Sequence, residues 1–232
     1  MERSHKFTDG LPGGLTAVVV AKAAVPGRVK TRLTRGDGAL SADQAAAVHA
    51  AMLDTVLRRV GAWADRRVLA MDDPAPGNIP AAARQGERVW EITEQGDGDL
   101  GERLERVWRN IPGGVVLLGV DSPDVPASAW SALEESLRTH DAAVGPVGDG
   151  GYWTLATRCR RVELVRGIDW GGAGVYDQTR RAAAAAGVTL AELPAWHDVD
   201  DPADLTALRQ RLIDAEEPAL IGLARRLDAI LD

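Results

Sequence analysis

The chain has 232 residues, 45% of them hydrophobic, and a formal net charge of -7 with a pI near 5.2. This length fits one domain with one sizeable core. The acidic balance argues against a nucleic-acid-binding protein, which would need a basic face. Without a run of 18 apolar residues we expect no membrane span. The single cysteine, Cys159, excludes an internal disulfide and is typical of a cytoplasmic protein.

Apolar runs and helical spacings alternate along most of the chain. We expect residues 1–15 to form a disordered leader without a secretory signal, and 16–232 to form one domain. Expected strands cover 18–20, 67–71, 87–92, 115–120, 142–146, 152–156 and 188–193; expected helices cover 41–60, 95–110, 127–139, an Ala-rich stretch ending near 186, 201–212 and 219–231. The alternation predicts an α/β sandwich whose central sheet is mostly parallel and flanked by helices.

A basic loop follows the first apolar strand, in the sequence VVVAKAAVPGRVKTRL. Four cations, Lys22, Arg28, Lys30 and Arg32, surround the turn Pro26-Gly27. The chain has three lysines, and two of them lie here, where a compact point charge suits phosphate. The glycine pattern matches neither the P-loop nor the dinucleotide-binding fingerprint. The loop therefore predicts a phosphate site of another kind.

Two acidic stretches are expected at the same edge of the sheet as this loop. Asp121 follows the strand 115–120, and in an extended segment 197–200 the side chains of Asp198 and Asp200 point the same way. Ligands of open α/β sheets lie outside the carboxyl ends of the strands. Hard divalent cations bind carboxylates together with substrate phosphates. We therefore expect Asp121 and Asp200 to bind Mg²⁺ or Mn²⁺.

Five ordered blocks of the chain resemble one bacterial family. They are AKAAVPGRVKTRL, QGDGDLGERL, LLGVDSPDVP, GPVGDGGYW and HDVDDPADL, spread over residues 16–213. In this order they resemble the small GT-A-like candidate glycosyltransferases, a family that includes members assigned to arsenosugar biosynthesis. The resemblance implies the nucleotide-diphospho-sugar transferase fold. It places Asp121 in the acidic metal motif and the four cations of the basic loop in the nucleotide loop.

The activity that this resemblance implies is metal-dependent transfer of a glycosyl group from a nucleotide-diphosphate sugar to a small-molecule acceptor. The sugar would then meet the stretch 148–153. Here Gly150 and Gly151 permit close backbone approach, and Tyr152 could stack on a ring. Asp149 could orient the acceptor or take its proton, which makes it the candidate catalytic residue.

Two other functions fit the same residues. The segment GRVKTRL also resembles the triphosphate-gripping loop of molybdopterin and phospholactate nucleotidyltransferases, and four cations suit a triphosphate. A nucleotidyltransferase would use a nucleoside triphosphate and release pyrophosphate. A non-catalytic nucleotide-binding module would keep the loop without needing the acids, so the presence of Asp121, Asp149 and Asp200 argues against it.

Overall fold

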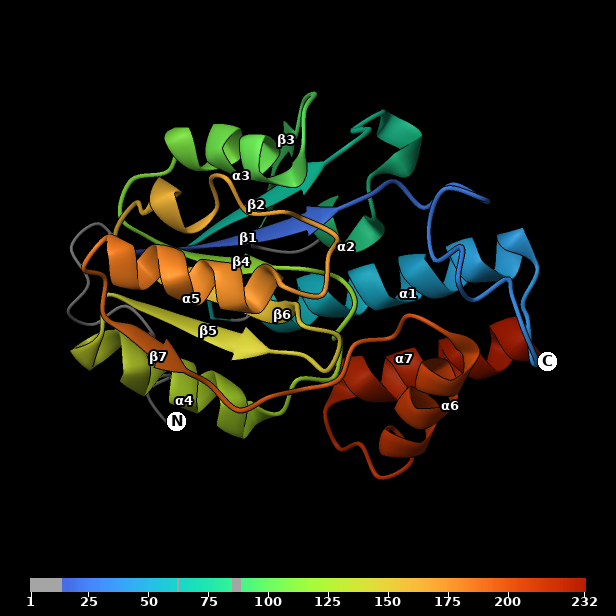
Figure 1. Cartoon of the computed structure of the whole chain (residues 1–232). Coiled ribbons are helices and arrows are strands. Elements are labelled where there is room, and N and C mark those ends of the chain that lie inside the picture. Colours follow the sequence, from blue (N-terminus) through green and yellow to red (C-terminus); the bar gives the residue numbers. More distant parts are fainter. Residues whose placement is uncertain (1–13, 62, 85–88) are drawn as a thin grey trace, which may run out of the picture.

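A seven-stranded sheet forms the centre of the computed structural model, which describes residues 14–61, 63–84 and 89–232 (Figure 1). The strands lie in the order β3-β2-β1-β4-β6-β5-β7. Their bounds are β1 Leu15–Ala21, β2 Arg66–Met71, β3 Glu91–Glu94, β4 Gly114–Leu118, β5 Ala142–Pro146, β6 Tyr152–Thr157 and β7 Leu190–Glu192. Among these described strands β6 runs antiparallel to its neighbours β4 and β5, and all other pairs are parallel.

Helices cover both faces of this sheet. They are α1 Ala42–Gly61, α2 Ala81–Arg84, α3 Leu100–Arg109, α4 Ala127–Thr139, α5 Val175–Ala185, α6 Pro202–Arg211 and α7 Pro218–Leu231, with short 3₁₀ turns η1 Pro76–Asn78 and η2 Val162–Leu164. Helices α1, α4, α6 and α7 contribute to one apolar core, and α3, η2 and α5 contribute to the other. The predicted α/β sandwich with a mostly parallel sheet is confirmed. None of the described helices combines the length and apolar character that crossing a membrane requires.

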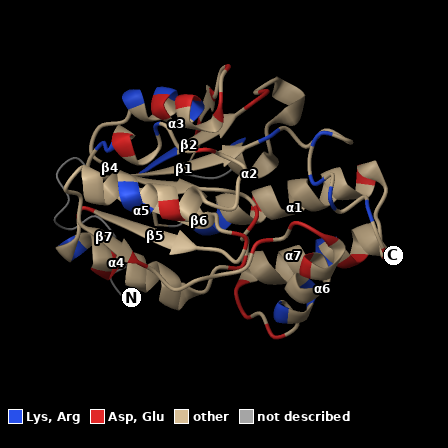
Figure 2. Cartoon of the chain, in the orientation of Figure 1, with Lys and Arg blue, Asp and Glu red and all other residues tan. Residues whose placement is uncertain are grey.

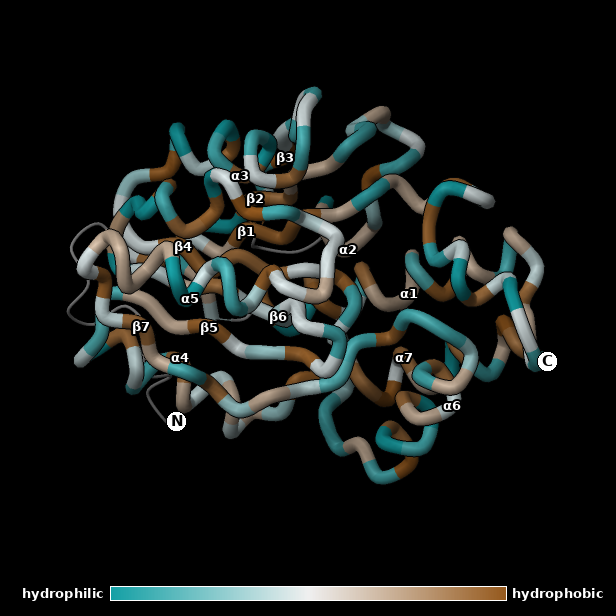
Figure 3. Tube along the Cα trace, viewed as in Figure 1, coloured by the Kyte–Doolittle hydropathy of each residue, from teal (hydrophilic) through white to brown (hydrophobic). Residues whose placement is uncertain are grey.

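The central strands are apolar on both faces, as a sheet covered by helices requires. In β1, Val19 packs into the core with α1 and α4, whereas its neighbour Val18 packs into the core with α3 and α5. In β4, Leu118 and Leu117 divide in the same way. Figure 3 shows this hydrophobic colour concentrated along the inner strands. The continuous apolar runs of the sequence therefore indicate burial on two faces.

Some strands begin or end at other residues than the sequence predicted. The strand expected at 87–92 is β3, Glu91–Glu94, and residues 85–88 lie outside the described part of the chain. Of the expected leader, residues 1–13 also lie outside it, and Leu15 is already the first residue of β1. The strand expected at 188–193 is shorter, Leu190–Glu192.

The directions of the strands bring the loops that carry the predicted site residues to one edge of the sheet. The parallel strands β1, β4, β5 and β7 all end at one edge of the sheet, and β6 starts there because it runs the other way. In Figure 1 the arrowheads of β1, β2 and β5 point to the side where α6 and α7 lie. The basic loop, Asp121, the turn between β5 and β6, and the segment before α6 consequently meet at this edge.

Candidate active site

The basic loop between β1 and α1 is folded onto two buried apolar side chains. Val29 is 4% exposed and Leu33 is fully buried. The Leu33 N–H donates to the Lys30 carbonyl at 3.0 Å, and the Leu40 N–H donates to the Leu33 carbonyl at 2.8 Å. These contacts fix the backbone, because apolar burial and satisfied backbone groups both favour one conformation. The charged residues between these anchors are held at the sheet edge.

Lys30 is the buried cation of this loop. Its side chain is 6% exposed, and its ammonium lies 2.5 Å from Asp121 Oδ1 and 3.6 Å from Asp200 Oδ1. The ammonium also donates to the Val199 carbonyl. One side chain therefore joins the basic loop, the end of β4 and the segment that leads into α6. The sequence predicted Lys30 as a phosphate ligand, and the structure adds this internal network around it.

The other loop cations are more exposed. Arg32 pairs with Asp200 at 2.8 Å while remaining 67% exposed, and Arg28 pairs with Asp72 at 3.3 Å while remaining 56% exposed. Lys22 is exposed and forms no ion pair with a described residue. Exposed ion pairs are weak, so these side chains can turn toward an incoming anion at little cost.

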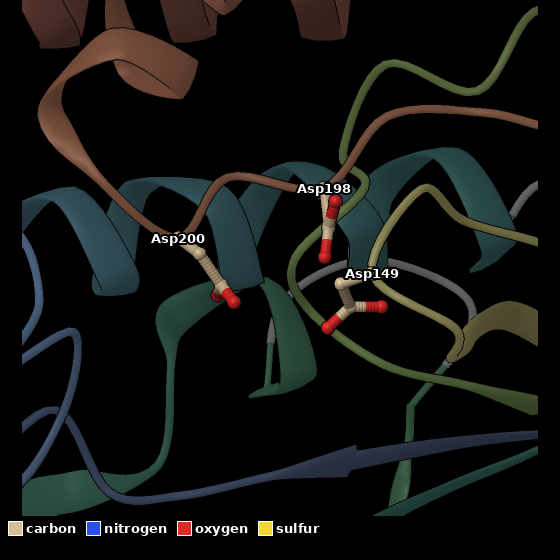
Figure 4. Close-up of side chains that lie close together, drawn as sticks. All are labelled: Asp149, Asp198 and Asp200. Carbon is tan, nitrogen blue, oxygen red and sulfur yellow. The ribbon is translucent and has the colours of Figure 1, made fainter. Parts of the chain in front are cut away.

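Three carboxylates converge where the β5–β6 turn faces the segment before α6. Oxygens of Asp149, Asp198 and Asp200 lie within 4.8 Å of one another. Figure 4 shows that these side chains approach one another from two separate loops, and Figure 2 shows the acidic segment that leads into α6. Burial raises the pKa of Asp198, and the charges of Asp149 and Asp200 raise it further. Three carboxylates at this spacing fit a hard divalent cation such as Mg²⁺ or Mn²⁺.

A cavity of about 180 Å³ opens beside these acids. Asp121 and Gly151 line it together with the three carboxylates. Asp121 therefore lies at the same cavity as Asp200, but its nearest described charge is Lys30 and it is not one of the three clustered acids. That Asp121 binds a metal ion stays a prediction.

The turn between β5 and β6 presents Asp149 through a tight backbone. The Gly151 N–H donates to Asp149 Oδ1 at 2.9 Å, so the carboxylate is fixed by its own turn. Gly150 has a φ of 89°, and a Cβ there would lie 1.9 Å from the Ala173 carbonyl oxygen. At Gly150 the close backbone contact is made with the segment before α5, and the predicted approach of Gly150 to a ligand stays a prediction. Gly151 lines the cavity itself.

Tyr152 contributes to the cavity wall, but its hydroxyl is buried. Burial raises the pKa of this hydroxyl, and the hydroxyl of Thr179 on α5 opposes that rise. The ring packs edge-on against Trp170, with 6.0 Å between the ring centroids. The predicted stacking of Tyr152 on a ligand ring stays a prediction.

Sequence reasoning missed two acids near this edge. Asp72 follows β2, accepts the Ala23 N–H at 2.7 Å and pairs with Arg28. Asp124 lies in the loop after β4 with 4% of its side chain exposed. Asp72 could have been found from its position directly after an apolar strand. Asp124 lies within the block LLGVDSPDVP, but its role could not be predicted because its partners come from distant parts of the chain.

The comparisons with known proteins agree with this fold. A candidate nucleotide-diphospho-sugar transferase from Desulfovibrio desulfuricans G20 is 27% identical, with a TM-score of 0.74 over 94% of this chain and 96% of that one. A nucleotidyl transferase from Methanothermobacter thermautotrophicus is 18% identical, with a TM-score of 0.55 over 86% and 98%. A 4-diphosphocytidyl-2C-methyl-D-erythritol synthase from Anaerococcus prevotii is 11% identical, with a TM-score of 0.55 over 96% and 99%.

The chain therefore has the nucleotide-diphospho-sugar transferase-like fold, which the candidate nucleotide-diphospho-sugar transferase and the nucleotidyl transferase share. The model of a family described as uncharacterized proteins conserved in bacteria, DUF2064, matches residues 52–172. The chain belongs to this family. A comparison with curated proteins gives no match.

Proposed function

We propose that this protein is a divalent-cation-dependent transferase that acts on a nucleotide substrate, and that it transfers a glycosyl group from a nucleotide-diphosphate sugar to a small-molecule acceptor. The observation that carries the proposal is the convergence of three carboxylates, Asp149, Asp198 and Asp200, beside the cations of the basic loop. The 27% identity over nearly the whole of a candidate nucleotide-diphospho-sugar transferase favours glycosyl transfer. A small nucleotide substrate and a lone, exposed cysteine fit a cytoplasmic protein.

The balance of charge at this edge supports the need for a metal ion. The acids at the edge are Asp72, Asp121, Asp149, Asp198 and Asp200, and the cations of the loop are Lys22, Arg28, Lys30 and Arg32. A diphosphate would bring further negative charge close to these five carboxylates. Like charges at short range disfavour binding until a cation compensates them.

The proposed roles follow from exposure and position. Asp149, Asp198 and Asp200 would hold the cation, which would stabilise the negative charge that develops on the leaving diphosphate. Arg28, Arg32 and the exposed Lys22 would neutralise phosphate oxygens from the other side. Asp121 would line the same cavity as a fourth carboxylate. Asp149 also has the position to orient an acceptor hydroxyl and accept its proton, because it lines the cavity beside Gly151.

The test is thermal unfolding of the protein with nucleotides and nucleotide sugars, with Mg²⁺ or Mn²⁺ and with chelator. We expect a clear rise in Tm only when both metal and nucleotide are present. Asp200→Asn should abolish most of that rise. Asp201→Asn is the matched control, because the neighbouring Asp201 caps α6 through the N–H groups of residues 203 and 204, and Asn caps helices equally well. Equal stabilisation in chelator would contradict the metal site.

Nucleotidyl transfer is the second candidate, and the four cations of the basic loop favour it. They would suit the three phosphates of a nucleoside triphosphate. The two reactions differ in product, since glycosyl transfer releases a nucleoside diphosphate or monophosphate, whereas nucleotidyl transfer releases pyrophosphate. Acceptor-dependent release of pyrophosphate would decide for the second candidate. Tight nucleotide binding without turnover of any donor would instead indicate a non-catalytic module.

A further inference from the structure

Two irregular segments carry three of the acids at the sheet edge. Asp121 lies in the loop between β4 and α4, and Asp198 and Asp200 lie in the segment between β7 and α6. Both stretches lie outside the strands and helices, although the Trp196 N–H donates to the Pro146 carbonyl of β5 at 3.0 Å and the Asp200 N–H donates to the capping Asp204 of α6 at 3.0 Å. One backbone bond joins the two segments directly, from the Val199 N–H to the Asp121 carbonyl at 3.0 Å. Lys30 also bridges the two segments, through Asp121 and the Val199 carbonyl. Because clustered carboxylates repel one another, any further attachment of these segments helps to hold the carboxylates in place.

Asp124 supplies that attachment. Its carboxylate accepts the indole N–H of Trp196 at 3.1 Å and the Arg211 guanidinium at 2.6 Å. Trp196 stands two residues before Asp198, and Arg211 is the last residue of α6, the helix that starts just after Asp201. One buried side chain is therefore bonded to the chain on both sides of Asp198 and Asp200. Its own side chain is 4% exposed, and it does not line the acidic cavity.

The loop that carries Asp124 is also hydrogen-bonded to helix α1. Arg59 of α1, with 8% of its side chain exposed, donates to the carbonyls of Pro123 and Val125 at 2.7 Å each. It also contacts both carboxylate oxygens of Glu217 at 2.9 Å. The backbone on each side of Asp124 is thus fixed to the helical layer. A rigid support of this kind is what holds ligating side chains in a productive geometry.

We propose that Asp124 is a positioning residue, which holds the Asp198 and Asp200 carboxylates at the cation site through Trp196 and Arg211. The inference rests on the proposed function, because it assumes that these carboxylates bind a divalent cation. It assigns to Asp124 no contact with substrate or metal. A carboxylate at this place is required because an asparagine could still accept the Trp196 N–H but would leave the Arg211 charge without its buried partner.

The experiment compares two buried aspartates by Mn²⁺ titration of the full chain, following the electron paramagnetic resonance signal of free Mn²⁺. Asp124→Asn should weaken Mn²⁺ binding about tenfold or more, as changes in the support of ligating residues do. Asp54→Asn is the matched control. Asp54 has 12% of its side chain exposed, accepts bonds from Arg58 and Arg226, and lies outside the acidic cavity. It should lose stability but bind Mn²⁺ within about twofold of the parent, since no cluster ligand changes.

A second variant keeps the test decisive if Asp124→Asn fails to fold. Trp196→Phe keeps an aromatic, though smaller, side chain and leaves the ion pair of Asp124 with Arg211 in place, but it removes the N–H donor. Loss of one hydrogen bond should weaken Mn²⁺ binding about threefold. Parent-like Mn²⁺ binding by a folded Asp124→Asn protein would overturn the proposal. An equal loss in Asp54→Asn would do the same, because the effect would then be one of general stability.

Amide hydrogen exchange separates failure of this inference from failure of the proposed function. If the parent binds no Mn²⁺, the cation site of the proposed function is wrong. The positioning role is then read from the Val199 amide, which is bonded to the Asp121 carbonyl. Exchange at Val199 should be at least about tenfold faster in Asp124→Asn than in the parent and unchanged in Asp54→Asn. Unchanged exchange in Asp124→Asn would overturn the inference on its own.

Discussion

Lys30 combines a buried charge with a backbone conformation that is unfavourable for most residues. Its φ is 47°, the single positive value outside glycine among the described residues, in a chain that otherwise uses glycine for such places. The left-handed region costs an L-residue about 1–2 kcal/mol. The ion pair with Asp121 and the bond to the Val199 carbonyl offset that cost. Strained residues of this kind cluster at functional sites.

The positive φ of Lys30 predicts that two substitutions at this position differ in stability, although both remove the same ammonium. Lys30→Ala and Lys30→Gly both remove the ammonium, but only glycine relieves the left-handed backbone. We expect the Gly variant to be more stable than the Ala variant by about 1 kcal/mol in urea unfolding. Equal stabilities would show that the backbone relaxes once the ammonium is gone.

His49 gives a second prediction at the scale of one residue. It is 5% exposed, and its Nε2 lies 3.0 Å from the Lys22 carbonyl. Burial lowers the pKa of this imidazole, although the bond to that carbonyl opposes the shift. Below about pH 6.5 the unfolded chain therefore binds a proton that the folded chain does not. The free energy of unfolding should decrease as the pH falls from about 6.5 to the lowered folded-state pKa of His49, and below that pKa it should decrease no further on account of this residue.

The measurement is chemical unfolding of the parent and of His49→Gln between pH 7.5 and 5. The parent should lose up to about 1.4 kcal/mol per pH unit more than the variant in this window. Parallel pH profiles of the two proteins would show that His49 titrates alike in both states.

At the scale of elements, the β5–β6 hairpin depends on its contact with the start of α5. Gly150 has positive φ, its carbonyl accepts the Tyr176 N–H at 2.8 Å, and its Cα faces the Ala173 carbonyl. Gly150→Ala adds a Cβ in a left-handed conformation and against a backbone oxygen. We expect a loss of at least about 2 kcal/mol in unfolding free energy.

Because the same turn presents Asp149, the metal-dependent rise in Tm should fall as well. Gly148→Ala is the control, since a Cβ at Gly148 meets no atom within 4 Å. Its stability should stay within about 1 kcal/mol of the parent, as for an unconstrained loop position. A Gly148→Ala protein as damaged as Gly150→Ala would show that the hairpin tolerates no side chain at all.

At the scale of the whole molecule, Asp54 joins the first and last helices behind the sheet. On α1 it accepts bonds from Arg58 at 2.8 Å and from Arg226 of α7 at 2.7 Å, and it also accepts the Ala82 N–H of α2 at 3.3 Å. Burial alone would raise the pKa of this carboxyl, but the bonds from Arg58 and Arg226 outweigh it and lower the pKa. A lowered pKa contributes stability above the unfolded value, near 3.9, which is lost as the pH falls through the folded value.

Asp54→Asn should therefore cost roughly 1.5–3 kcal/mol at pH 7, the range for hydrogen bonds to a charged group. The difference between parent and variant should shrink as the pH falls below about 4, because the unfolded carboxyl takes up a proton there while the folded one stays charged down to its lowered pKa. Urea unfolding at pH 7 and pH 3 measures both values. A difference that persists undiminished at pH 3 would mean that shape, and not charge, holds α1 to α7.

Local patterns in the sequence were sufficient for several features. Apolar runs such as those of β1 and β4 determined the buried strands, because a strand covered on both faces needs no polar alternation. The pair Asp201-Pro202 determined the start of α6, and the predicted cap is confirmed by bonds to the N–H groups of residues 203 and 204. The order of strands and helices was enough to predict the fold class and the edge of the sheet at which the basic loop and Asp121 meet.

Tertiary structure decided which charged groups meet. The sequence singled out Asp121, Asp149 and Asp200, but only folding placed Asp198 and Asp149 together from segments 49 residues apart and turned Lys30 inward between two acids. The reversed direction of β6 and the contact of Gly150 with Ala173 were likewise set by packing. The reason is physical: propensities and periodicity act over a few neighbouring residues, whereas ion pairs and close backbone contacts depend on distances through space.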